Sequence, residues 1–89
     1  MHTVAVLALD GVIAFDLATP VEVFGRTRLP DGRAAYRVKV CAPDGDVDAG
    51  AFTLRAPWDL RALDTADTII LPGLADPTAP LPSGVLEAL

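Results

Sequence analysis

The sequence predicts an α/β fold, a flavodoxin-like doubly wound parallel sheet of which this chain supplies the N-terminal portion. Two largely apolar runs, residues 3–9 (TVAVLAL) and 67–71 (DTIIL), are typical of strands buried on both faces. Between them lie a segment with helical spacing and a segment that alternates polar and apolar residues. We therefore expect residues 3–9 to form a central strand, with 67–71 parallel on one side and 35–42 on the other.

The first helix is expected over residues 16–27, where apolar side chains recur at positions i, i+4 and i+7. Asp16 stands where an N-cap belongs. Pro20 is expected in the first turn of this helix, where a missing backbone N–H is tolerated best.

The remaining elements are shorter. Polar and apolar residues alternate over residues 35–42. This pattern predicts a strand with one face more exposed to solvent, near a sheet edge. A hairpin is expected around residues 48–54, and a helical turn from Pro57 to about Leu63. Ser83 is expected to cap a final helix over residues 84–89.

Composition narrows the class of protein. With 89 residues, 52% of them hydrophobic and 21% charged, the chain has the composition of one folded domain and not of a disordered tail. A formal net charge of -5 argues against a nucleic-acid-binding surface in this stretch. One Cys and one His are too few for a disulfide framework or most metal sites, and we expect no cofactor. No apolar run approaches the roughly 18 residues of a membrane span, so we expect a cytoplasmic protein without membrane contact.

The end of the chain predicts an incomplete domain. The last helix is too short to be stable alone, and the run 67–71 lacks an outer neighbouring strand. We therefore expect residues 1–89 to be part of a larger domain, and the isolated chain to associate through the exposed edge of residues 67–71. The alternative is a minimal α/β domain whose last helix packs back on the sheet.

The residues described so far resemble the N-terminal half of the DJ-1/PfpI family, within the class I glutamine amidotransferase-like superfamily. The matching segments are VAVLALDGVIAFDLATPVEVF, VKVCAPDG, AFTLRAPWDL and DTIILPG. The resemblance covers essentially the whole chain. It is strongest to the GlxA-like sensor domain that precedes an AraC-type helix-turn-helix domain in bacterial transcriptional regulators.

The resemblance implies a domain that senses a small-molecule ligand or signal, is a homodimer when intact, and contacts DNA only through a C-terminal domain outside this chain. The alternative is a cysteine enzyme of the same family, such as an isocyanide hydratase or a deglycase-like hydrolase. The family's reactive cysteine follows the next strand, beyond Leu89, so whether the protein is an enzyme stays open. A third possibility is an interaction module without chemistry.

Three candidate catalytic residues follow from the resemblance: Asp16, Gly73 and Leu74. Asp16 matches the acidic position that faces the cysteine sulfur in the family, and an ordinary N-cap is the simpler explanation. Gly73 and Leu74 match a turn whose backbone N–H groups face the pocket as an oxyanion hole. The simpler explanation there is a turn that ends a strand.

Two further residues are interpreted structurally. Cys41 lies among apolar strand residues without an adjacent base, so we expect a buried, inert thiol. Trp58 is expected to pack over the sheet edge, and a role at a dimer interface is the alternative.

Overall fold

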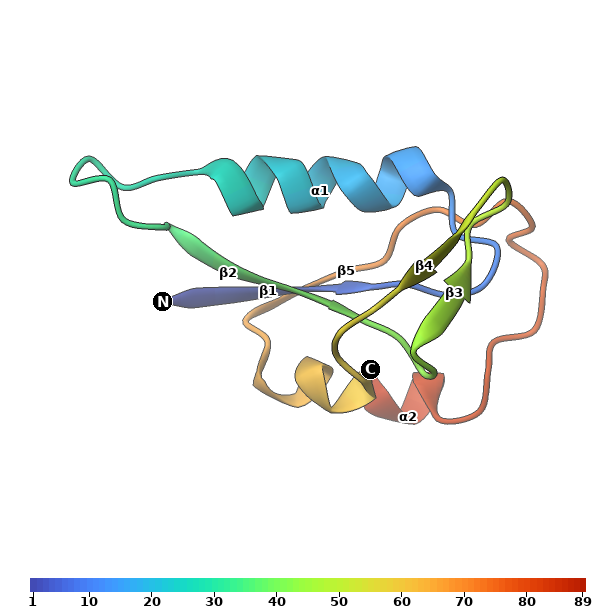
Figure 1. The fold of residues 1–89 in the computed structure, drawn as a ribbon. Coiled ribbons are helices and arrows are strands. Elements are labelled where there is room, and N and C mark those ends of the chain that lie inside the picture. Colours follow the sequence, from blue (N-terminus) through green and yellow to red (C-terminus); the bar gives the residue numbers. More distant parts are fainter.

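The computed structural model describes residues 1–89, and Figure 1 shows its elements in chain order. They are β1 (His2–Leu7), α1 (Ala14–Arg26), β2 (Tyr36–Cys41), β3 (Asp46–Asp48), β4 (Thr53–Arg55), the 3-10 helix η1 (Leu60–Thr65), β5 (Thr68–Ile70) and α2 (Val85–Ala88). Three strands form a parallel sheet in the order β2-β1-β5, and β3 and β4 form a separate antiparallel hairpin. The predicted α/β class and the predicted order of the three parallel strands are confirmed.

The central strand pairs very differently with its two neighbours. It pairs with β2 along its whole length, from His2 opposite Tyr36 to Leu7 opposite Cys41. It pairs with β5 over only three residues, from Val4 opposite Thr68 to Val6 opposite Ile70. The sheet is therefore well formed on the β2 side and short on the β5 side.

Helices cover both faces of the sheet, as Figure 1 shows with α1 on one side and η1 and α2 on the other. Successive residues of a strand point to opposite faces. Val4 and Val6 accordingly pack in one apolar cluster with Leu17 of α1. Ala5 and Leu7 pack in a second cluster, whose members from the other layer include Ala62, Leu63 and Val85. Burial on both faces explains why β1 is apolar at every position from Val4 to Leu7.

The N-terminus of α1 differs from the prediction. The helix begins at Ala14, its N-cap is Ile13, and no side chain caps it. Asp16 is therefore the third helical residue, and Pro20 lies in the second turn instead of the first. The early start has a long-range cause: the N–H of Ile13 donates to the carbonyl of Gly73, 2.9 Å away, and fixes the chain just before the helix.

Two predictions near the C-terminus are also corrected. Gly84, at φ 86°, and not Ser83, is the N-cap of α2, which has only four residues. The residues of β5 are half-buried instead of fully buried, because one edge of β5 has no neighbouring strand. The next residue, Leu71, is 61% exposed.

The outer edge of β2 is partly closed by Trp58, which confirms that this residue packs over the sheet edge. The N–H of Ala42 donates to the carbonyl of Trp58 at 3.0 Å, and the N–H of Trp58 donates to the carbonyl of Val40 at 3.3 Å. The backbone of Trp58 is thus part of the sheet. No helix in the structure is both long enough and apolar enough to cross a membrane.

Replacing Pro20 with alanine should stabilise the protein. Pro20 has no N–H to donate to the carbonyl of Asp16, and proline inside a helix costs up to about 3 kcal/mol relative to alanine. We expect Pro20→Ala to raise the free energy of unfolding by about 1–3 kcal/mol in urea titrations.

Pro30→Ala is the matched control, because Pro30 lies in a turn where proline restricts the unfolded chain. We expect this variant to leave stability unchanged or slightly lower. A loss of stability in Pro20→Ala would contradict the helix assignment.

Candidate functional site

Two turns lie side by side at the carboxyl ends of β1 and β5. The N–H of Ile13 donates to the carbonyl of Gly73 at 2.9 Å, and the N–H of Ala75 donates to the carbonyl of Gly11 at 2.8 Å. These two bonds flank an antiparallel bridge between Val12 and Leu74. The turn after β5 is thereby clamped to the turn before α1.

The clamp brings two of the three predicted site residues into contact. A Cβ atom at Gly73 would lie 2.6 Å from Oδ2 of Asp16 and 3.4 Å from Cδ1 of Ile13. The Asp16 carboxylate therefore sits directly against the Gly73 backbone, where only glycine fits. Asp16 also lies in the first turn of α1, where the helix dipole stabilises a negative charge. The N-cap explanation for Asp16 is wrong, since its side chain caps no helix.

The third residue, Leu74, faces elsewhere. Its side chain packs against both apolar clusters and lines two small cavities, of about 130 and 260 Å³, together with Leu9 and Leu81. Its φ is not positive, so its backbone is unstrained. Only the backbone groups of Leu74 can therefore contribute to a site beside Asp16. No backbone carbonyl accepts a hydrogen bond from the N–H of Gly73 or of Leu74.

Asp16 and Gly73 line a shallow groove of about 490 Å³ between α1 and β5. Most of the lining is apolar, and three of its side chains are strongly exposed: Phe15 at 77%, Val23 at 57% and Leu71 at 61%. Asp16 is the one charged residue in this groove. A carboxylate beside apolar surface and free backbone donors can hold and orient a small polar ligand.

The only cysteine is not part of this site. Cys41 is 0% exposed, at the end of β2. Burial, and secondarily the negative charge of Asp59, raises the pKa of its thiol. Because the thiolate is the reactive form, the thiol is protected both by burial and by its raised pKa. The prediction of a buried thiol is confirmed.

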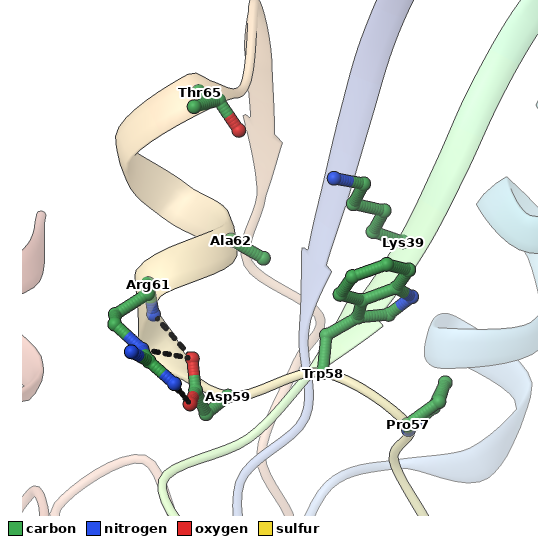
Figure 2. Close-up of a pocket in the computed structure, with 7 residues that line it drawn as sticks. All are labelled: Lys39, Pro57, Trp58, Asp59, Arg61, Ala62 and Thr65. Carbon is green, nitrogen blue, oxygen red and sulfur yellow. Dashed lines mark hydrogen bonds and ion pairs between the residues drawn. The ribbon is translucent and has the colours of Figure 1, made fainter.

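Sequence reasoning missed a second hollow, on the face of the sheet that η1 covers. It is lined by Lys39 of β2, by Trp58 and Asp59 of the segment that leads into η1, and by residues of η1 itself, among them Arg61 (Figure 2). The available signal was Lys39 itself, the only lysine of the chain, on a strand whose other face is apolar.

The structure contains no group of three or more His, Cys, Asp or Glu side chains placed to hold a metal ion. Comparisons with protein-family models, with curated proteins and with solved structures found no match to this chain.

Replacing Gly73 with alanine should destabilise the protein. The new methyl group would meet the Asp16 carboxylate at 2.6 Å, and overpacking of this kind costs about 1–3 kcal/mol. We expect a loss of that size in the free energy of unfolding, and a smaller loss when Gly73→Ala is made in an Asp16→Ala background.

Gly25→Ala is the matched control, since a Cβ at Gly25, within α1, meets nothing within 4 Å. There we expect a gain of about 0.5–1 kcal/mol from helix propensity. Equal effects of Gly73→Ala with and without Asp16 would show that the two residues are not in contact.

Cys41 should make stability fall at alkaline pH. The folded state holds the thiol proton more tightly than the unfolded state, because the pKa is raised on folding. The stabilisation is complete below the unfolded pKa of about 8.5 and is lost as pH rises toward the folded pKa, with a slope approaching 1.4 kcal/mol per pH unit. Subtracting the pH profile of Cys41→Ala from that of the wild type isolates this contribution. If the difference in the free energy of unfolding between the wild type and Cys41→Ala stays constant between pH 7 and pH 10, the thiol is not buried.

Proposed function

We propose that residues 1–89 form the N-terminal portion of a DJ-1/PfpI-like domain that senses a ligand or signal in a GlxA-like, AraC-family transcriptional regulator. The observation that carries the proposal is the contact between the Asp16 carboxylate and Gly73 at the carboxyl edge of a parallel sheet. Open α/β sheets bind their ligands outside the carboxyl ends of the strands. The proposal is supported by the resemblance, since both positions match site residues of the DJ-1/PfpI family.

In this proposal the sheet β2-β1-β5 is the start of a flavodoxin-like, doubly wound sheet. The next strand of the complete domain pairs with the free edge of β5. The same addition covers the exposed side chains Phe15, Val23 and Leu71 along the groove. The intact domain forms a homodimer, and DNA is contacted by a C-terminal domain outside this chain. The regulator acts in the cytoplasm.

The ligand would bind at the end of the groove where Asp16 and Gly73 meet. The Asp16 carboxylate accepts a hydrogen bond from a donor on the ligand, or from a group that the rest of the domain supplies. The N–H groups of Gly73 and Leu74, which no backbone carbonyl uses, donate to an oxygen of the ligand. The ligand is therefore small and carries both a donor and an acceptor.

A cysteine enzyme of the same family is the second candidate. The observation that favours it is the pair of free N–H groups at Gly73 and Leu74, because adjacent backbone donors can stabilise a developing oxyanion. Such an enzyme needs a nucleophile, and buried Cys41 is unsuited to that role. The 89-residue chain by itself should therefore turn over neither isocyanides nor glyoxals.

The coding sequence that follows the codon of Leu89 is the first test. A Ser-x-Cys-x-Gly-Ala segment followed by two helix-turn-helix patterns supports the regulator. The same segment followed by a stop codon supports the enzyme. A stop codon directly after Leu89 contradicts both.

The second test uses the full-length protein with Asp16→Asn and, as the control, Glu22→Gln. Glu22 is exposed and pairs with Arg26 on α1, away from the groove. If the domain is a sensor, Asp16→Asn removes the response of a reporter gene to its inducing condition and Glu22→Gln leaves it intact. If both variants respond like the wild type, Asp16 has no part in sensing.

A further inference from the structure

The hollow between β2 and η1 has the volume of a small-molecule site. Its volume is about 460 Å³, within the roughly 300–1,000 Å³ of typical ligand pockets. Seven residues line it: Lys39, Pro57, Trp58, Asp59, Arg61, Ala62 and Thr65. It shares no residue with the groove that holds Asp16 and Gly73. A ligand bound in this hollow therefore does not depend on the site proposed at Asp16 and Gly73.

The lining is positively charged in an otherwise acidic chain. Lys39 and Arg61 carry two positive charges against the single negative charge of Asp59, whereas the whole chain has a formal net charge of -5. A positive hollow on an acidic protein attracts small anions more specifically than the rest of its surface.

Asp59 does not neutralise Lys39, because its carboxylate is already paired with Arg61. Its Oδ1 accepts from the backbone N–H of Arg61 at 2.9 Å and caps η1, and its Oδ2 accepts from Nη2 of Arg61, also at 2.9 Å. The hydrogen bonds from Arg61 lower the pKa of Asp59, so this carboxyl stays ionised and paired. The ion pairs of the chain join Arg26 to Glu22, Arg33 to Asp31, Arg55 to Asp46, and Arg61 to Asp59. Lys39 is in none of them.

Lys39 is nevertheless held in position. Its Nζ lies 4.3 Å from the centroid of the Trp58 ring, in a cation–π contact. Trp58 is itself fixed by its two backbone hydrogen bonds to the edge of β2, while its side chain remains 46% exposed. Figure 2 shows the Lys39 ammonium and the Thr65 hydroxyl both directed into the hollow. A charged donor, a hydroxyl and an open indole surface are thus presented together.

We propose that this hollow binds a small aromatic carboxylate. The carboxylate accepts hydrogen bonds from Nζ of Lys39 and from the hydroxyl of Thr65. The planar body of the ligand packs against the exposed part of the Trp58 indole and against Ala62. The ion pair of Asp59 with Arg61 closes one side of the hollow and holds the start of η1 in place.

The test is a titration of the 89-residue chain followed by the fluorescence of Trp58, its only tryptophan. The protein is used at a concentration where sedimentation gives a single species. Benzoate is the probe, benzamide has the same ring without the charge, and acetate has the charge without the ring. We expect a saturable change with benzoate, and affinities at least about tenfold lower for benzamide and acetate.

The matched variants remove one positive charge each from the same strand and the same sheet face. Lys39→Met removes the proposed contact, and we expect it to weaken benzoate binding by about tenfold. Arg37→Met, two residues earlier on β2 and outside the hollow, should bind benzoate like the wild type. Thr65→Ala provides an independent test through another element, with an expected weakening of about fivefold.

Three results would overturn the proposal: no saturable response to benzoate, equal binding of benzamide and benzoate, or equal weakening by Arg37→Met and Lys39→Met. If circular dichroism shows that Lys39→Met is unfolded, benzoate binding by Thr65→Ala is the deciding measurement. Unchanged benzoate binding in a folded Thr65→Ala variant then counts against the site.

Discussion

The arrangement of the whole molecule depends on the clamp between the turn after β1 and the turn after β5. Its two hydrogen bonds, Ile13 to Gly73 and Ala75 to Gly11, join segments that are distant in the sequence. The clamp makes α1 begin at Ala14, and it thereby sets which residues of the first turn face the turn after β5. Without it, the three-residue pairing of β5 with β1 would be the main tie between the last strand and the sheet.

The two faces of the sheet offer different chemistry because β1 separates two independent layers. On the side of α1 an acidic residue, Asp16, lies at an apolar groove. On the side of η1 a positive charge lies over an aromatic ring, with Lys39 fixed on Trp58. Both arrangements use rigid parts of the fold, since Gly73 and Trp58 are each anchored by backbone hydrogen bonds. The buried strand between them explains how one small domain keeps the groove and the hollow apart.

The sequence was a good guide wherever the signal was local. The apolar runs predicted β1 and β5 and their order around the sheet, and the alternation in β2 predicted an edge strand. It failed where the cause was long-range: the start of α1 depends on Gly73, and no local pattern reveals that bond. For the same reason the contact of Lys39 with Trp58 was missed, because it joins a strand to a segment beyond the hairpin. The contact of Asp16 with Gly73 was approached only through a resemblance, which supplied the residues but not their geometry.

The residues that break the ordinary rules of helix construction gather on one side of α1. Ile13 at the N-cap offers no capping side chain, Pro20 interrupts the second turn, and Phe15 exposes 77% of its surface. Pro20 and Phe15 line the groove that ends at Gly73. For stability alone, a capping residue at position 13, alanine at position 20 and a polar residue at position 15 would serve better. Departures from local rules concentrate at functional or interacting surfaces, since only a gain elsewhere retains them. The clustering of these residues indicates, independently of any resemblance, that the face of α1 toward β5 forms a contact in the working protein.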